Sequence, residues 1–179
     1  MKSALNILEN LDLRSHGVQI AENLRHETLA FSESPTGIPK AALTEFYGPA
    51  GSGKTSSIIK LLEEHPDLRP CWIENGLTIN PQAVAQKGVD IKRLLFIDIF
   101  NHTELLFWSA LQTVRSQLFD IVIIAIQSIK KQTEVARHLR RLQIEARTSG
   151  TIVLFLSETP LSLDNSHRWM FARSLQFGL

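Results

Sequence analysis

Eight residues from Gly48 to Thr55, with the sequence GPAGSGKT, say most about how this chain can fold. They match the pattern G-x-x-x-x-G-K-[ST], in which a short strand runs into a glycine-rich turn that opens a helix. The flanking residues fit, since TEFYG (44–48) is typical of a strand and KTSSIIKLLEEH (54–65) of a helix that Pro66 ends. This stretch predicts a domain in which strands and helices alternate.

The rest of the chain continues the alternation. Further strands are predicted at 71–74, 94–100, 121–126, 151–156 and 169–177, and further helices at 81–87, 103–118 and 130–148. The run IVIIAI at 121–126 is apolar on both faces, as expected of a central parallel strand. The sequence therefore predicts an α/β fold with a mostly parallel sheet and helices on both of its faces.

The first 35 residues differ in pattern from the rest of the chain. Leu5, Leu8 and Leu11 recur at roughly helical spacing, and this periodicity continues to about residue 30. The stretch SESPTGIPK (32–40) is a cluster of turn-forming residues. We therefore predict an N-terminal helical segment at 1–35 and a compact core at 36–179.

Composition and charge exclude several classes of protein. The net charge of +1 creates no global field toward nucleic acid or anionic membrane. The single cysteine, Cys71, allows no internal disulfide framework, and its strand position predicts a small buried apolar side chain. The longest fully apolar run, 121–126, is too short to span a membrane, and the N-terminal residues lack the apolar stretch of a signal peptide. We expect a cytoplasmic protein that contacts no membrane.

Each part of the glycine-rich loop suits phosphate binding. Glycines let the backbone curl so that its N–H groups point at phosphate oxygens, and the next helix directs its positive dipole end at the same anion. Lys54 supplies a charge for the β- and γ-phosphates, and Thr55 supplies a hydroxyl for Mg²⁺. We therefore predict that ATP is bound by Gly48, Pro49, Ala50, Gly51, Ser52, Gly53, Lys54 and Thr55, with Thr55 also as a metal ligand.

The surroundings of this loop resemble RecA-type proteins. TGIPKAALTEFYGPAGSGKTSS (36–57) is similar to their G-[LI]-P-x-G segment, strand and phosphate loop. The likeness continues through CWIENGLTINPQAVAQKGVDIKRLLF (71–96), with matches at Pro81, Gly88, Val89, Asp90, Leu94 and Leu95. It covers about residues 36–158. The resemblance implies that 36–179 is a minimal RecA-like P-loop NTPase core that uses ATP and Mg²⁺.

Two positions depart from the RecA-like pattern. RecA-like ATPases end the strand at 121–126 with an aspartate that anchors Mg²⁺ through water, and that position is Ala125 here. Their water-polarising glutamate corresponds to Gly76. Without a general base, hydrolysis is expected to fall by roughly 10²–10⁴. We therefore assign no catalytic residue and expect weak or no hydrolysis, unless Glu74 or Glu158 replaces the missing carboxylate.

Among RecA-like proteins, the segment GIPKAALTEFYGPAGSGKTS is most similar to ImuA-type proteins. These are accessory factors of bacterial mutagenic translesion synthesis that work with a non-catalytic Y-family polymerase homologue. The resemblance implies an ATP-binding accessory role in the DNA damage (SOS) response, with the polymerase assembly or RecA as partner, and it allows a homo-oligomer. An active DNA-dependent ATPase or recombinase paralogue is the alternative, and a small-molecule P-loop kinase is a less favoured third.

The predicted helix at 130–148 is rich in basic residues. Arg137, Arg140 and Arg141 share one face at i, i+3 and i+4. This face suits a weak contact with nucleic-acid phosphates or with an acidic partner. A solvated helix face is the alternative interpretation.

Overall fold

The computed structural model describes residues 27–76, 79–100, 102–126, 132–161 and 167–170. In chain order its elements are β1 (Thr28–Phe31), β2 (Ser34–Pro39), β3 (Leu43–Tyr47), α2 (Lys54–Glu64), β4 (Pro70–Glu74), α3 (Pro81–Gln86), the 3₁₀ turn η3 (Ile91–Arg93), β5 (Leu95–Asp98), α4 (Thr103–Ser116), β6 (Ile121–Ile126), α5 (Gln132–Ser149), β7 (Ile152–Ser157) and β8 (His167–Met170). The predicted alternation of strands and helices from the glycine-rich loop onward is confirmed.

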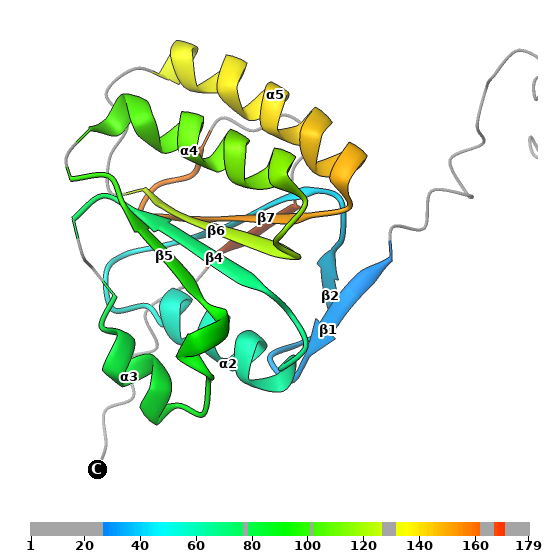
Figure 1. Cartoon of the computed structure of the whole chain (residues 1–179), viewed down its shortest axis with the longest axis vertical. Coiled ribbons are helices and arrows are strands. Elements are labelled where there is room, and N and C mark those ends of the chain that lie inside the picture. The colour runs from blue at the N-terminus through cyan, green and yellow to red at the C-terminus, as the bar shows by residue number, and fades with distance from the viewer. Residues whose placement is uncertain (1–26, 77–78, 101, 127–131, 162–166, 171–179) are drawn as a thin grey trace, which may run out of the picture.

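The main sheet has six strands in the order β5-β4-β6-β7-β3-β8, and every neighbouring pair is parallel (Figure 1). Tyr47 at the end of β3 and Ile126 at the end of β6 both pair with Ser157 of β7. The carboxyl ends of the three central strands therefore meet at one edge of the sheet. Ligands of open parallel sheets bind at this edge.

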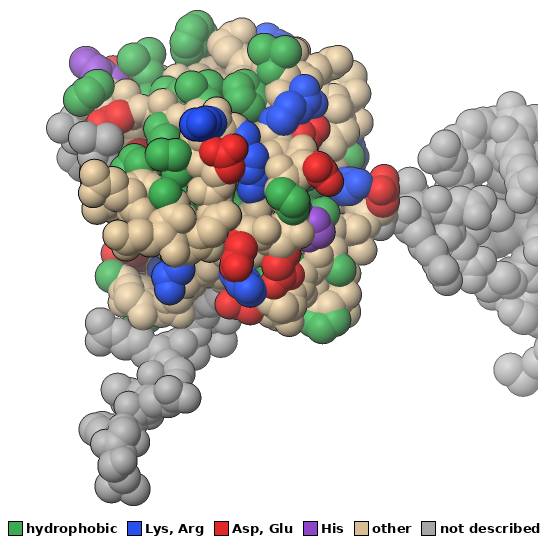
Figure 2. Space-filling view, turned by 60° about the horizontal axis from the view of Figure 1, so that its bottom comes forward, with side chains coloured by type: hydrophobic (Ala, Val, Ile, Leu, Met, Phe, Trp, Pro, Cys, Tyr) green, Lys and Arg blue, Asp and Glu red, His purple; other side chains and the backbone are tan. Residues whose placement is uncertain are grey.

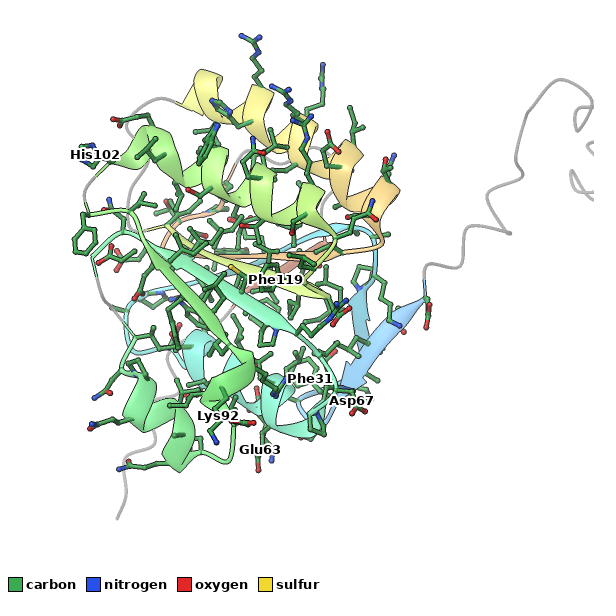
Figure 3. The ribbon with its side chains drawn as sticks, in the orientation of Figure 1. Phe31, Glu63, Asp67, Lys92, His102 and Phe119 are labelled. Carbon is green, nitrogen blue, oxygen red and sulfur yellow. The ribbon has the colours of Figure 1, made fainter. Side chains whose placement is uncertain are left out.

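Helices cover both faces of the sheet, as predicted. One hydrophobic cluster joins the sheet to α4 and α5, and a second joins it to α2 and α3. Alternation along β4 divides its side chains between them, with Cys71 and Ile73 in the first cluster and Trp72 in the second. Figure 3 shows a residue on each side, because Phe119 packs against the first cluster and Phe31 belongs to the second.

The segment before the core differs from the prediction. Residues 1–26 of the predicted helical segment lie outside the described residues, but 28–31 form β1 rather than helix, and most of the predicted turn cluster forms β2. The two strands pair antiparallel, with Leu29 opposite Ile38. Gly37, at a φ of +77°, permits the close pairing, because a Cβ there would lie 2.8 Å from the carbonyl carbon of Leu29. These contacts depend on pairing with a later segment, which local periodicity does not register.

Cys71 is buried on β4, as its strand position predicted. Burial raises the pKa of its thiol to about 12, and a hydrogen bond with Thr113 opposes this only in part. The thiolate is the reactive form of cysteine. In the folded chain Cys71 is therefore a packing residue and not a nucleophile.

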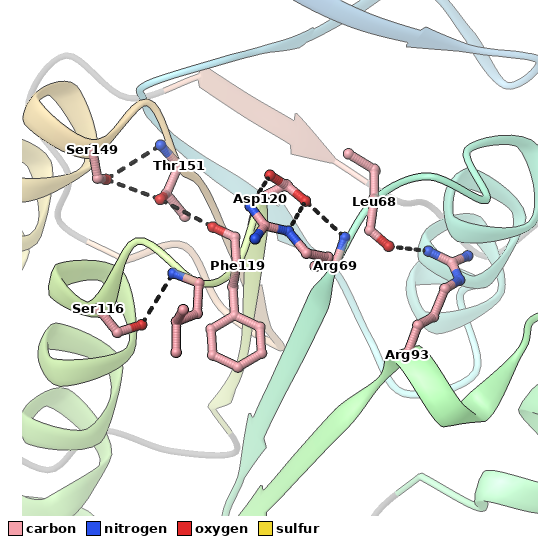
Figure 4. Close-up of polar contacts among 9 residues, drawn as sticks. Leu68, Arg69, Arg93, Ser116, Phe119, Asp120, Ser149 and Thr151 are labelled. Atoms are coloured by element: carbon pink, nitrogen blue, oxygen red, sulfur yellow. Dashed lines mark hydrogen bonds and ion pairs between the residues drawn. The ribbon is translucent and has the colours of Figure 1, made fainter.

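The amino ends of the strands are joined by an ion pair in the turns that precede β4 and β6. The Arg69 side chain donates from Nε to Oδ2 and from Nη2 to Oδ1 of Asp120, both at 2.9 Å, and its backbone N–H donates to Oδ2 at 2.8 Å (Figure 4). These bonds lower the pKa of Asp120, while its partial burial opposes them. The backbone carbonyl of Asp120 also accepts from Ile152 at the start of β7, at 2.9 Å. One residue therefore links three strands opposite the ligand-binding edge.

We predict that Cys71 resists alkylation in the native state. With a pKa near 12 in place of 9, the thiolate fraction at pH 8 is lower by about a thousandfold, and burial excludes reagent as well. Iodoacetamide labelling with mass-spectrometric detection should show rapid modification in urea and almost none in buffer. Equal labelling in both conditions would contradict this placement of β4.

We predict that Asp120→Asn destabilises the fold at neutral pH. The folded-state pKa of Asp120 is lowered, so the stabilisation is present above its unfolded pKa, near 3.9, and is lost as pH falls through the folded value. Urea denaturation should show a lower midpoint for the variant at pH 7 and a smaller difference from wild type near pH 3. Glu63→Gln, which removes an exposed pairing with Lys60 on α2, is the control and should change the midpoint less. A pH-independent difference would contradict the ion-pair explanation.

Candidate nucleotide-binding site

The predicted phosphate loop lies at the carboxyl edge of the sheet, between β3 and α2. The backbone N–H of Gly48 donates to the carbonyl of Ser157, at 3.2 Å, which ties the start of the loop to the end of β7. Because β7 lies between β3 and β6, the loop opens beside the ends of the central strands. The sequence motif and the ligand-binding edge thus coincide.

Two glycines give the loop its shape. Gly51 and Gly53 have φ values of +75° and +96°, a region that other residues rarely adopt. A Cβ on either would meet no atom within 4 Å, so backbone conformation and not crowding requires glycine at these positions. Positive φ in successive turns points backbone N–H groups into a common concavity that suits an anion.

The start of α2 offers further N–H donors. Gly53 is the N-cap and provides no side-chain cap, and the bond from the N–H of Ser57 to the carbonyl of Gly53 closes the first turn, at 2.9 Å. The N–H groups that precede Ser57 in the helix have no acceptor within α2. No acidic residue lies in this first turn. The helix terminus therefore presents donors and its positive dipole end with no competing carboxylate.

Lys54 reaches back over the loop. Its Nζ donates to the carbonyls of Gly48 and Pro49, at 2.5 and 2.9 Å, and to Oγ of Ser52 at 3.3 Å. Partial burial lowers the pKa of Lys54, and the carboxylate of Glu158 opposes that shift. The ammonium group thus lies at the mouth of the loop on weak neutral acceptors, for which a phosphate oxygen would be a stronger substitute.

A cavity of about 430 Å³ opens beside the loop. Its lining comprises Ala50–Ser56 together with Trp72, Ile79, Ala125, Ile126, Leu156, Ser157 and Glu158. Six of the eight predicted residues, Ala50 to Thr55, lie in this wall, while Gly48 and Pro49 contribute through the carbonyls that hold Lys54. The volume is in the range of small-molecule sites. One wall is polar and formed by the loop, and the opposite wall is largely apolar.

The two departures from the RecA-like pattern differ in where they lie. Ala125 is part of the cavity wall, next to Leu156 of β7. Gly76, at a φ of +92°, lies after β4 and donates its N–H to Oδ1 of Asp98 on β5, at 2.9 Å. The same oxygen accepts from the N–H of Phe100 at 3.0 Å. The turn that would carry a catalytic glutamate is therefore tied to the neighbouring strand.

Of the two candidate replacement carboxylates, Glu158 lies in the cavity wall. Glu74 is 2 % exposed within β4 and is not among the residues that line the cavity. Sequence reasoning expected Trp72 to pack in the core or at an edge, and did not anticipate it in the cavity wall. The available signal was strand parity, because Trp72, Glu74 and Gly76 alternate onto the same side of the sheet.

The predicted basic face lies away from this cavity. Arg137, Arg140 and Arg141 are exposed on α5, which packs with α4 on the other side of the sheet from α2. On the α2 side, charges of both signs are interspersed (Figure 2), and Lys60 pairs there with Glu63 and Glu64. Any contact that these arginines make is therefore separate from the phosphate loop.

Metal and membrane features are limited within the described ranges. Among those residues no group of three histidine, cysteine, aspartate or glutamate side chains could hold a metal ion. No helix in the described part of the chain combines the length and apolarity needed to cross a bilayer.

Comparison with known proteins gives a consistent result. No family model matches the chain. It is 23 % identical over 146 residues to Protein RecA of Acinetobacter baylyi and, over the same length, to Protein RecA of Legionella pneumophila. It is 25 % identical over 146 residues to Protein RecA of Xanthomonas campestris pv. campestris. Each match covers 71 % of this chain but only 42 % of the relative, so the chain spans about two fifths of their length. The chain is thus similar in sequence to RecA proteins and has the α/β fold of a RecA-like core.

Proposed function

We propose that this chain is a RecA-like ATP-binding accessory protein of the bacterial DNA damage response, with a degenerate hydrolysis site. The observation that carries the proposal is the division of the cavity into a phosphate-binding wall and an apolar wall. The first contains Gly51, Gly53 and Lys54, and the second contains Ala125 where an ATPase of this type has an aspartate. Such a cavity suits binding of a triphosphate better than its cleavage.

ATP binding would use the chain's own donors in three ways. The loop and first-turn N–H groups would surround the phosphate oxygens, and Lys54 would exchange the carbonyls of Gly48 and Pro49 for the β- and γ-phosphates. The hydroxyl of Thr55 would be a ligand of Mg²⁺. Because the described residues offer no acidic metal cluster, the phosphates themselves would hold most of the ion.

Weak hydrolysis makes ATP a conformational ligand in this proposal. A nucleotide shifts a protein between two states only if it binds them with different affinities. The similarity to RecA proteins and the resemblance to ImuA-type factors support a partner in a translesion polymerase assembly or in RecA, in the cytoplasm. The exposed arginines of α5 are the surface that best suits an additional contact with DNA phosphate or with a second subunit.

An active DNA-dependent ATPase is the second candidate. Glu158 favours it, because this carboxylate lines the cavity and acts electrostatically on Lys54. In that case Glu158 would orient or deprotonate the attacking water. In the accessory proposal it only repels phosphate.

We predict that Lys54→Ala weakens ATP binding by about tenfold or more, because a charge-assisted bond to phosphate is lost. Titration calorimetry of the full chain with ATP and Mg²⁺ measures this. Lys60→Ala, on the exposed face of the same helix, is the matched control and should bind as wild type does. ATP binding that survives Lys54→Ala unchanged would place the nucleotide elsewhere, and no binding by the wild type would refute the proposal.

We predict that Glu158→Gln tightens ATP binding by about two- to fivefold, because a like charge beside the phosphates is removed. The wild type should hydrolyse ATP near background with or without single-stranded DNA, and the variant should not change that rate. A phosphate-release assay on both proteins tests this. DNA-stimulated hydrolysis that both Lys54→Ala and Glu158→Gln abolish would establish the second candidate instead.

A further inference from the structure

Trp72 carries a buried hydrogen-bond donor without a partner. The residue is 1 % exposed in the middle of β4 and lines the cavity beside the phosphate loop. Its indole Nε1 is buried and has no acceptor among the described residues. It is the only cavity-lining side chain in the described part of the chain with a buried polar atom in that state.

An indole N–H can donate but cannot accept a hydrogen bond. Buried donors in native proteins are almost always paired, and an unpaired one loses the hydrogen bond that water would have made. A ligand oxygen in the cavity would recover this loss. The wall around Trp72 therefore selects for an acceptor and against an apolar ligand.

No other side chain in the described apolar wall can donate. Ile79, Ala125, Ile126 and Leu156 have no polar side-chain atoms. Ser157 already gives its hydroxyl proton to Oε1 of Glu45, at 2.8 Å. An anion held by the loop would find on this side the indole N–H as its available side-chain donor.

We propose that the Trp72 indole N–H donates to the terminal phosphate of a bound nucleoside triphosphate and so distinguishes it from a diphosphate. This rests on the proposed function. The loop and Lys54 hold the phosphates on one wall, and Trp72 lies on the strands where RecA-like proteins are expected to place the groups that act on the γ-phosphate. A neutral donor there stabilises the bound triphosphate without activating water.

The same residue connects the nucleotide to the protein interior. Trp72 belongs to the hydrophobic cluster that includes Ile58 and Leu61 of α2 and Val84 of α3. A hydrogen bond formed only with the triphosphate would order the indole within this cluster. The packing between β4, α2 and α3 would then differ between the triphosphate and diphosphate complexes.

The indole N–H resonances of the ¹⁵N-labelled wild-type chain report this bond directly. The chain has three tryptophans, and Trp72→Phe, Trp108→Phe and Trp169→Phe each remove one signal and so assign it. A non-hydrolysable ATP analogue with Mg²⁺ should move the Trp72 proton downfield, as a new hydrogen bond does, and ADP should not. The Trp108 signal should stay in place, because this side chain is 60 % exposed on α4 across the sheet. A Trp72 signal that responds equally to both nucleotides, or to neither when both bind, would overturn the inference.

Affinities give an independent readout. By calorimetry the wild type should prefer the ATP analogue over ADP, and Trp72→Phe, which keeps an aromatic ring but removes the donor, should weaken the analogue by about tenfold and leave ADP unchanged. Trp108→Phe is the control and should behave as wild type does. An unchanged preference in Trp72→Phe would refute the role of Trp72 while the proposed function stands. Failure of the wild type to bind either nucleotide would refute the proposed function itself.

Discussion

The positive φ angles of Gly51 and Gly53 are the constraint on which the site depends, because they let the chain turn from β3 into α2 within a few residues. This turn brings the helix terminus beside the ends of the parallel strands. The all-parallel sheet collects those ends at one edge, and the Arg69–Asp120 pair holds the opposite edge together. Loop, helix dipole and cavity therefore result from one tight connection between two regular elements.

The cavity combines a strong anion site with an apolar wall, and this combination separates binding from cleavage. Backbone donors and Lys54 require no acidic residue to hold a phosphate, so they retain their chemistry when Ala125 lies across from them. Water activation does require a base, and Glu158 is the carboxylate that lines the cavity in the described part of the chain. The structure thus supports a protein that responds to nucleotide occupancy, with the indole of Trp72 placed to read the terminal phosphate.

Most of the core could be predicted from sequence because its signals are local. The loop needs glycine at particular angles, β6 is apolar throughout, and each later helix has its own periodicity. The β1–β2 hairpin was mispredicted because its burial depends on pairing between Leu29 and Ile38, which local spacing does not encode. Trp72 was missed for a related reason, since an apolar strand residue that faces a cavity has the same pattern as one that faces the core. The choice between Glu74 and Glu158 likewise depended on which strand end reaches the loop.

Hydrogen exchange of the backbone amides at 50–56 tests the central claim most directly. If those N–H groups close around a triphosphate, ATP with Mg²⁺ should slow their exchange strongly, while the amides of the exposed turn at 65–67 should exchange as before. Mass-spectrometric exchange on the full chain resolves the two segments. Identical exchange at 50–56 with and without saturating ATP would contradict the account.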